Sequence, residues 1–406
     1  MPLRERSVVD QREELVTLAL APGANKSEVF RRFGMSRSKG YKWLLRYAAE
    51  GRTGLADRSR RPRSSPRRTP PAVEAEVLRV RAESNDAWGG RKIARVLDRG
   101  GTRDVPAAST ITEILRRNGR LEANAIEHPG PCQRFERERP NELWQMDFKG
   151  PFAIGSGRCH PLTVLDDHSR YSLGLEACSD QEDQTVRDQL TGVFECYGLP
   201  EGMLMDNGSP WGDSGGRPFT SLTVWLLRLG VHVSHGRPYH PQTQGKDERF
   251  HRTLKAEVLR GRQFVDLADC QRAFDDWRHR YNQERPHQAI NMATPAERYQ
   301  ASPRPFPTRL PAIEYGPDDL VRKASKDGDI GFKNHRVRLG KPFRGELVAV
   351  RPTGKDGIFS IHFCTHHIAT IDLTVEPSAR GRVDIARAMP TSPQAQKQQQ
   401  NQSNRI

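Results

Sequence analysis

The apolar residues of the first 50 positions recur at helical spacing in three short segments. Ser27 and Ser36 are expected to cap the second and third helices, and Gly34 and Gly51 to end them. Two helices, a tight turn and a third helix form the layout of a helix-turn-helix unit, although a plain helical bundle shows the same pattern. Residues 1–50 are therefore predicted to form one all-α domain.

The helical pattern repeats in residues 72–122, which predict a second helix-turn-helix unit with Ser109 or Thr110 capping its third helix. Between the two units, residues 51–71 contain seven arginines, four prolines and one aspartate. Such a segment cannot build an apolar core, so it is predicted to be an extended linker. A further linker is expected at residues 123–140.

The pattern changes near residue 141. Three strands are followed by a helix, a strand, a helix, a strand and further helices up to residue 300, an order typical of a mixed α/β sheet covered by helices. In residues 317–376, short alternating segments with Gly and Pro between them predict a small β-barrel. Residues 377–406 lack an apolar pattern and are expected to form a disordered tail.

Positive charge is concentrated at both ends of the chain. Residues 1–140 hold 30 Lys and Arg against 18 Asp and Glu, residues 141–298 hold 18 against 22, and residues 299–406 hold 17 against 10. Basic flanks predict binding to a polyanion such as double-stranded DNA, whereas solubility alone does not explain the change of sign near residue 140. The candidate DNA-contacting residues in the N-terminal part are Arg37, Lys39, Lys42, Arg60, Arg61, Arg91 and Lys92.

The six cysteines form no CxxC pair and no regular framework, which indicates reduced thiols in a cytoplasmic protein. No apolar run approaches the roughly 20 residues that a membrane helix needs. The first residues also lack the apolar core of a signal peptide. We therefore expect no membrane partner.

Three carboxylates of the central part occupy distinctive positions. Asp147 lies in the middle of a strand, on its polar face. Asp206 ends a short apolar strand, and open α/β sheets place their chemistry at the carboxyl ends of strands. Glu248 lies in the helical stretch HPQTQGKDERFHRTLKAE, next to Asp247. Which of these two adjacent carboxylates faces outward can be predicted from the helical repeat.

At 100° per residue, Glu248 lies about 160° from Phe250, which marks the buried stripe of this helix, whereas Asp247 lies only about 60° away. Glu248 is therefore predicted to face outward, on the same side as Arg252 and Lys255, and Asp247 to make a local structural contact. An ordinary ion pair between Glu248 and Arg252 is the alternative.

Three carboxylates brought together would repel one another, and a divalent cation would remove that conflict. Mg²⁺ prefers carboxylate and water oxygens. Two such ions about 4 Å apart would stabilise the attacking and leaving oxygens of a phosphodiester displacement. Two Mg²⁺ ions, with Mn²⁺ as a substitute, are therefore the expected cofactors, and Arg252 and Lys255 would hold DNA phosphates beside them.

The stretches WQMD, LDDHSRY, MDNG, HPQTQGKDERFHRTLK and YNQERPHQAINMATPAERY follow one another in residues 141–300. In this order they resemble the catalytic core of bacterial insertion-sequence transposases of the DDE class, whose core is similar to that of retroviral integrases. The resemblance implies a ribonuclease-H-like fold with Asp147, Asp206 and Glu248 as the catalytic, metal-binding triad. It also matches Arg252 and Lys255 to basic positions that contact DNA.

Two features depart from the family pattern. Forty-one residues separate Asp206 from Glu248, a longer gap than is usual, and residues 211–220 read as a loop extension. The sequence also lacks the His-His-Cys-Cys zinc module of retroviral integrases. The paired helix-turn-helix units stand in its place, which favours a transposase over an integrase.

Several other residues have competing interpretations. Asp166 and Asp167 are possible metal ligands, but their position at a turn favours capping. His362, Cys364 and His366 alternate along one strand, yet no fourth zinc ligand of fitting spacing is near.

Three residues near the carboxylates are also ambiguous. Trp211 either stacks on a DNA base or packs within its loop. His240 and Gln242 either touch DNA or cap the helix that carries Glu248.

The sequence thus predicts a transposase that binds the terminal inverted repeats of its own element. It would hydrolyse a phosphodiester at each end and join the freed 3′-OH to target DNA without a covalent enzyme intermediate. A homo-oligomeric synaptic complex is expected because two DNA ends must be paired, and a bacterial, nucleoid-associated location follows. A ribonuclease-H-like nuclease that cuts without joining and a transposase-derived DNA-binding regulator are the alternatives.

Overall fold

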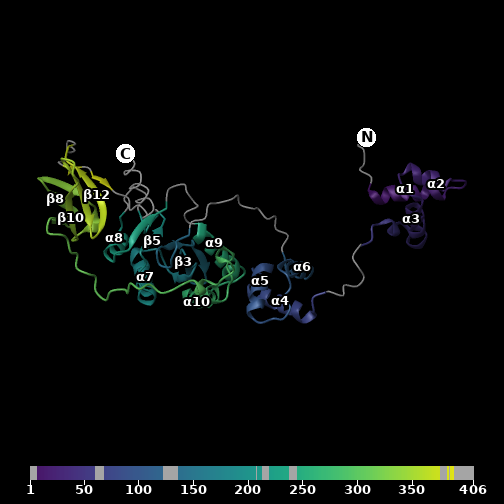
Figure 1. Ribbon diagram of the computed structural model, residues 1–406, viewed down its shortest axis with the longest axis horizontal. Helices are drawn as coiled ribbons and strands as arrows, with labels where there is room; N and C mark the ends of the chain where they lie inside the picture. The colour runs from purple at the N-terminus through teal and green to yellow at the C-terminus, as the bar shows by residue number, and fades with distance from the viewer. Residues whose placement is uncertain are drawn as a thin grey trace. The chain divides into compact units, whose positions relative to one another are not determined.

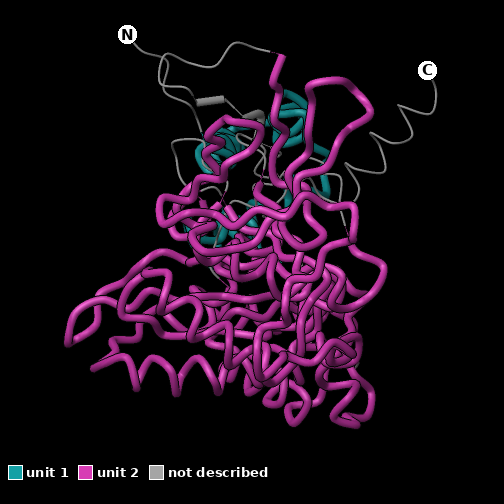
Figure 2. Tube along the Cα trace, turned by 90° about the vertical axis from the view of Figure 1, so that its left-hand side faces the viewer, with its two compact units in different colours: residues 1–68 teal, residues 69–406 magenta. Residues whose placement is uncertain are grey.

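The computed structural model describes most of the chain in eight stretches, which are residues 7–59, 68–121, 136–206, 208–212, 219–236, 245–374, 382–383 and 385–387. Two compact units are present, residues 1–68 and 69–406, coloured teal and magenta in Figure 2.

The first unit consists of α1 (Val8–Leu20), α2 (Lys26–Arg32), α3 (Arg37–Glu50) and a 3₁₀ turn (Gly51–Leu55). Ser36 caps α3 as predicted, since its side chain accepts the backbone N–H of Lys39. The cap of α2 is Asn25, not Ser27, because Asn25 precedes the first helical residue and accepts the N–H of Glu28. Leu55 is fully buried in the core of this unit, so the extended linker predicted from residue 51 begins later.

The second unit begins with three more helices, α4 (Pro71–Glu83), α5 (Gly90–Arg99) and α6 (Ala108–Arg117). They enclose a small apolar core that includes Val77, Ile93 and Ile111. The N-cap of α6 is Ala107, without a side-chain hydrogen bond, so the prediction of Ser109 or Thr110 as cap is wrong. Helix α6 simply starts earlier than its hydroxyl residues suggest.

A six-stranded sheet forms the centre of this unit (Figure 1). Its strands are β1 (Trp144–Phe148), β2 (Phe152–Ile154), β3 (Gly157–Asp166), β4 (Ser172–Cys178), β5 (Gly202–Met205) and β6 (His232–His235). The order is β2-β3-β1-β5-β6, with β4 on the other side of β3; β1 runs parallel to β5 and antiparallel to β3. Three strands were predicted in this first part of the core, and four are present, because the first predicted strand is divided into β1 and β2. The strand is interrupted by Gly150, whose φ is +89°, and by Pro151, which has no N–H to donate.

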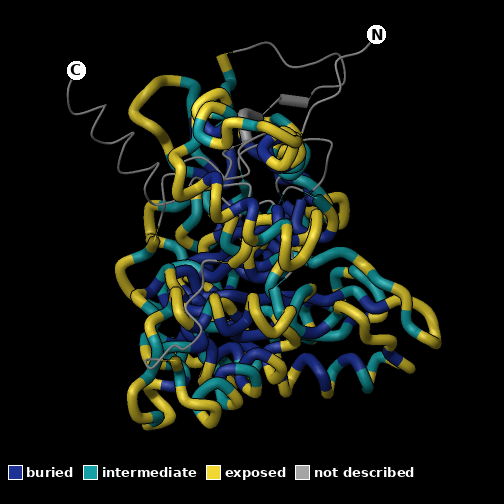
Figure 3. Tube along the Cα trace, turned by 90° about the vertical axis from the view of Figure 1, so that its right-hand side faces the viewer, coloured by how far each residue is buried: buried dark blue, intermediate teal, exposed yellow. Residues whose placement is uncertain are grey.

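Helices cover both faces of the sheet. One face packs against α7 (Asp183–Tyr197) and α8 (Ser221–Arg228). The other packs against α9 (Gly245–Leu254), its π-helical continuation (Lys255–Leu259) and α10 (Leu267–Gln283). Figure 3 shows the buried segments gathered in the interior of this unit. Helix α9 therefore covers part of the polar face of β1, where the side chain of Asp147 remains 24% exposed.

After α10, short 3₁₀ turns at Gln288–Ile290 and Pro295–Glu297 lead to the C-terminal sheets, which contain a third at Lys341–Phe343. The strands are β7 (Leu320–Lys323), β8 (Asp329–Phe332), β9 (His335–Arg338), β10 (Leu347–Pro352), β11 (Ile358–Phe363), β12 (His366–Asp372), β13 (Arg382–Val383) and β14 (Ile385–Arg387).

These strands form a five-stranded sheet, β14-β12-β11-β10-β7, and a three-stranded sheet, β13-β9-β8. Among the described residues the pairing does not close the sheets into the predicted barrel. The expectation of a disordered tail from residue 377 is wrong for β13 and β14, which pair with β9 and β12. Residues far apart in sequence supply those partners, so the local pattern gave no sign of them.

Candidate catalytic site

Strand pairing brings the first two carboxylates together. The parallel register of β1 and β5 sets Trp144 opposite Met203 and Gln145 opposite Leu204. Two positions further along each chain lie Asp147 and Asp206. Since neighbouring strands are about 4.8 Å apart and side chains alternate in step, these two carboxylates leave adjacent strands on the same face.

Backbone contacts fix the turn that carries Asp206. Its Oδ1 accepts the N–H of Gly208 at 2.9 Å. Its carbonyl oxygen lies 2.7 Å from Nδ1 of His235, at the end of β6. Asp206 is thus held just beyond the carboxyl end of β5, the position that the sequence predicted for it.

Helix α9 brings the third carboxylate to this face. Glu248 is exposed, whereas Asp247 is 1% exposed, so the predicted helical phase is confirmed. The described chain contains no ion pair between Glu248 and Arg252, the alternative role of Glu248. The local contact predicted for Asp247 is not seen at its Oδ1, which is buried and has no hydrogen-bond partner.

The pKa of Asp147 is affected by both of the other carboxylates, Asp206 and Glu248. Burial raises the pKa of its carboxyl to about 7, and the charges of Asp206 and then Glu248 contribute in the same direction. Like charges keep apart, and among the described residues no three His, Cys, Asp or Glu side chains converge tightly enough to hold one metal ion. The carboxylates lie within electrostatic reach of one another without forming a coordination shell.

Asp247 adds a fourth carboxyl to this region. Burial raises its pKa well above the ordinary range, and the nearby Asp147 and Asp167 raise it further. A buried carboxyl surrounded by other carboxylates is stabilised in its neutral form.

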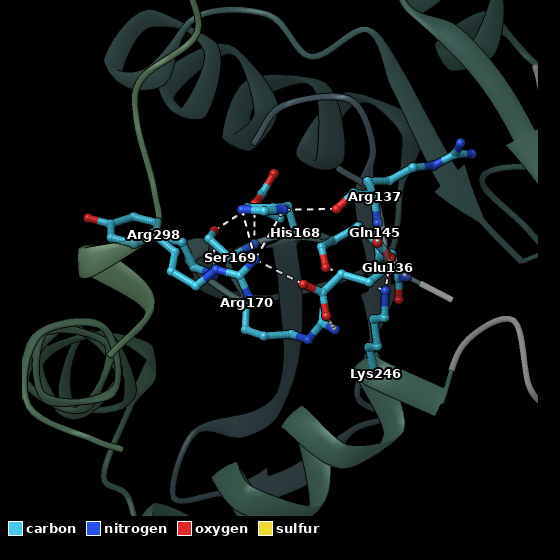
Figure 4. Close-up of polar contacts among 11 residues, drawn as sticks. Glu136, Arg137, Gln145, His168, Ser169, Arg170, Lys246 and Arg298 are labelled. Carbon is cyan, nitrogen blue, oxygen red and sulfur yellow. Dashed lines mark hydrogen bonds and ion pairs between the residues drawn. The ribbon is translucent and has the colours of Figure 1, made fainter. Parts of the chain in front are cut away.

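An ion pair holds the start of α9 against the sheet (Figure 4). Lys246 pairs with Oδ1 of Asp167, which also accepts Nε2 of Gln145 at 2.7 Å. The other oxygen of Asp167 accepts the N–H of Arg137. Asp166 accepts the N–H and hydroxyl of Ser169, so it caps the β3–β4 turn, as the preferred interpretation held. Both aspartates are occupied by these structural contacts.

A second contact joins α9 to β1. The hydroxyl of Thr163 donates to the carbonyl of Asp147 and lies 2.9 Å from Nε2 of His251. The other ring nitrogen of His251 is 4.0 Å from a carboxylate oxygen of Asp147. Burial lowers the pKa of His251 to about 4, so the ring is neutral and its Nε2–H donates to Thr163.

The predicted DNA-contacting residues fall in three places. Arg37, Lys39 and Lys42 are exposed on α3 of the first unit. In the second unit Arg91 is exposed and Lys92 half-buried at the start of α5, while Arg252 and Lys255 are exposed beside Glu248. The remaining four, Arg60, Arg61, His240 and Gln242, lie outside the described residues.

Two further interpretations can be compared with the structure. Trp211 is buried and stacks on Phe148 with ring centroids 5.5 Å apart, which is the packing alternative. His362, Cys364 and His366 belong to no cluster of metal-ligating side chains in the described part of the chain.

Sequence reasoning missed Glu257, in the π-helical turn after α9. Its carboxylate accepts Nε1 of Trp88 at 3.0 Å, Nε1 of Trp277 at 2.8 Å and Nε of Arg285 at 2.9 Å. A signal was present, because Glu257 falls only about 20° from Phe250 on an ideal helix. A carboxylate on a buried stripe needs partners from other elements.

Family models match successive parts of the chain. Two models, both described as an integrase core domain, match residues 137–241 and 229–295. The C-terminal domain of IS481 family transposases matches residues 319–378. A helix-turn-helix domain matches residues 11–63, and a homeodomain-like domain matches residues 39–115.

Two proteins of insertion elements are among the similar relatives. A 31.7 kDa protein of IS407 from Burkholderia multivorans is 26% identical over 239 residues, which are 56% of this chain and 82% of that protein. A 39.2 kDa protein of IS476 from Xanthomonas euvesicatoria is 29% identical over 160 residues, 39% of this chain and 44% of that protein. The catalytic core domain of HTLV-2 integrase in complex with magnesium aligns with 40% of this chain and 99% of its own, at 14% identity and a TM-score of 0.32.

The N-terminal models support DNA as the partner, and no described helix is long and apolar enough to cross a membrane. An integrase core domain lies between them and a transposase C-terminal domain, and one insertion-element protein, that of IS407, resembles the chain over 56% of its length. The chain is therefore similar to insertion-sequence transposases, and its integrase core domain and transposase C-terminal domain indicate an enzyme that cuts and joins DNA.

Proposed function

We propose that Asp147, Asp206 and Glu248 are the catalytic carboxylates of this transposase. The observation that carries the proposal is the register of β1 and β5, which sets Asp147 beside Asp206 under the helix that bears Glu248. Their mutual effect on the pKa of Asp147 agrees with this arrangement. Asp166 and Asp167 are poorer candidates because their oxygens already accept hydrogen bonds from the turn and from Gln145.

The donor set fits Mg²⁺, with Mn²⁺ as a substitute, since three carboxylates without a paired cation offer only hard oxygen ligands. When bound, two such ions would activate the attacking oxygen and stabilise the leaving one in a phosphodiester displacement. Asp147 and Asp206 would hold them from the sheet and Glu248 from α9. The ion pair of Lys246 with Asp167 and the contact of His251 with Thr163 position α9 over the strands.

The cations around the carboxylates would hold the DNA. Arg252 and Lys255, exposed after Glu248 on the same helix, would neutralise backbone phosphates near the cut. The exposed Arg37, Lys39 and Lys42 on α3 would contact the terminal inverted repeats of the element. Their distance along the chain from the carboxylates agrees with separate recognition and cleavage functions.

The reaction proposed is hydrolysis at each 3′ end of the element, followed by attack of the freed 3′-OH on target DNA. Water and then the 3′-OH are the nucleophiles, so no serine or tyrosine nucleophile is required. Pairing two ends implies a homo-oligomer on the DNA, within the nucleoid of a bacterial cell.

A strand-transfer assay tests the proposal. Purified protein is mixed with a labelled duplex carrying the element's end, a target plasmid and Mg²⁺. Three variants are expected to keep DNA binding and to lose both cleavage and joining: Asp147→Asn, Asp206→Asn and Glu248→Gln. Wild-type protein in EDTA is expected to behave in the same way. Asp247→Asn is the matched control on the same helix.

The other outcomes separate the alternatives. Cleavage without joined product would indicate a nuclease, and tight binding without cleavage a DNA-binding regulator. Loss of binding in all three variants would show that the carboxylates are structural.

A further inference from the structure

The second helix-turn-helix group is docked on the catalytic core through several polar contacts. Besides the bond from Trp88 to Glu257, Nδ2 of Asn85 donates to the carbonyl of Ala256 at 3.3 Å. Arg280 of α10 donates to the carbonyl of Glu83 at 2.7 Å. These contacts join the α4–α5 connection to the segments that follow α9.

Glu257 is the central hydrogen-bond acceptor of this contact region between the second helix-turn-helix group and the catalytic core, which we call the dock. Its side chain is 6% exposed, and it pairs with Arg285, which is 9% exposed. The two tryptophan N–H groups also donate to this carboxylate and carry no charge. Its single negative charge is therefore matched by Arg285 and does not balance any further cation.

Two further cations, Lys92 and Arg249, lie near Glu257 along the boundary between α5 and α9, which we call the seam. Lys92, four residues after Trp88 in the first turn of α5, is half-buried, and the charges of Arg285, Glu257 and Arg249 act on it. Burial lowers the pKa of Lys92 to about 8, and both arginines lower it further. In the described part of the chain neither Lys92 nor Arg249 has an ion pair or a side-chain hydrogen bond. Three cations thus share one carboxylate, which leaves an excess of two positive charges.

The position of this excess charge indicates its ligand. Arg249 directly follows Glu248 on α9, so the seam begins beside the proposed catalytic carboxylates. Its other side is α5, which packs against α6, the third helix of the docked group. A duplex held by the docked group and cut at Glu248 would pass over the seam, and a partly desolvated cation cluster favours a phosphate.

We propose that Lys92 and Arg249 bind one backbone phosphate of the element-end DNA, between the recognised sequence and the cleaved bond, while Arg285 stays paired with Glu257. The inference rests on the proposed function, since it assumes that Glu248 is at the cut. The rigid dock would then fix the number of base pairs between recognition and cleavage. Lys92 would then contact DNA from a position fixed against the catalytic core.

Neutral linkages in the DNA test this site. Single methylphosphonates are placed one at a time along a labelled end duplex, and binding is measured by fluorescence anisotropy without divalent metal. Wild type is compared with Lys92→Gln, Arg249→Gln and the control Arg272→Gln, an arginine that is 70% exposed on α10.

For wild type and the control, neutralising one linkage near the cut should weaken binding. For Lys92→Gln and Arg249→Gln that linkage should make no difference, and the slope of log affinity against log salt should fall by about 0.9 for each lost contact. Responses equal to wild type at every linkage would refute the site. Arg249 is exposed, so its variant keeps the test valid if Lys92→Gln is unfolded.

Failure of the proposed function has a different signature. Wild type would then bind the end duplex no better than a scrambled duplex, or would not cut it when Mg²⁺ is added. Neither result depends on Lys92 or Arg249.

Discussion

Glu257→Gln should loosen the dock between the second helix-turn-helix group and the catalytic core. The substitution keeps the size of the side chain and one acceptor oxygen but removes the charge. Arg285 would then remain buried without a counter-ion, 9% exposed. One of the two tryptophan N–H groups would face an amide N–H instead of an oxygen.

The size of the effect follows from these contacts. Breaking a buried ion pair by removing one partner costs about 3–5 kcal/mol. Trp88→Phe removes only one hydrogen bond to a charged acceptor, for which about 1.5–3 kcal/mol is expected. Because both changes act on the same carboxylate, their effects should not add in the double variant.

Hydrogen exchange of the full chain, without DNA, measures these opening energies locally. At about 1.4 kcal/mol per tenfold change, Glu257→Gln should speed exchange in α5 and α10 by roughly 100- to 5,000-fold. Glu284→Gln is the matched control, since Glu284 is 56% exposed and 3.8 Å from Arg280, and exposed pairs contribute little. Exchange in Glu257→Gln as slow as in Glu284→Gln would refute the role of Glu257.

Three further predictions concern other parts of the chain. Asp247→Asn should remain active in strand transfer, and an inactive variant would contradict the predicted helical phase. The variant should also be more stable than wild type at pH 8 but not near pH 4. The reason is that the pKa of Asp247 is raised in the folded state, so ionisation of this carboxyl weakens the fold as pH rises. His287 is buried, with its pKa lowered by burial and by Arg285, so thermal stability should fall as pH drops below about 6.5. His287→Phe should show a smaller loss between pH 7 and 5, and an equal loss would assign the pH dependence to other histidines. Gly40→Ala should destabilise the first unit by about 1–3 kcal/mol in thermal unfolding, because its Cβ would lie 2.4 Å from the ring of Phe30. Ser38→Ala, at an exposed position two residues earlier on the same helix, should have no such effect.

Part of the site could be predicted from the sequence because it depends on local periodicity. The helical repeat placed Glu248 outward and Asp247 inward, and burial in the structure agrees. The strand and helix order of the core also followed from alternation and helical spacing. Errors occurred at element ends: Asn25 and Ser27 competed for the cap of α2, and α6 begins at an alanine without any side-chain cap.

Long-range pairing could not be predicted in this way. Nothing local in Lys246 indicates Asp167, 79 residues away, and nothing in Glu257 indicates Trp88, 169 residues away. The sequence indicated that Asp147 lies on the polar face of its strand, but it did not indicate that His251 of α9 lies 4.0 Å from that carboxylate.

The sequence by itself determined most of the helices and strands of the core, and which way Glu248 and Asp247 face, since both follow from neighbours within a few residues. The tertiary structure decided that β1 lies beside β5 and that the second helical group is docked on the core. Only that pairing brings Asp147 next to Asp206, because a register between distant strands depends on the packing of the whole sheet.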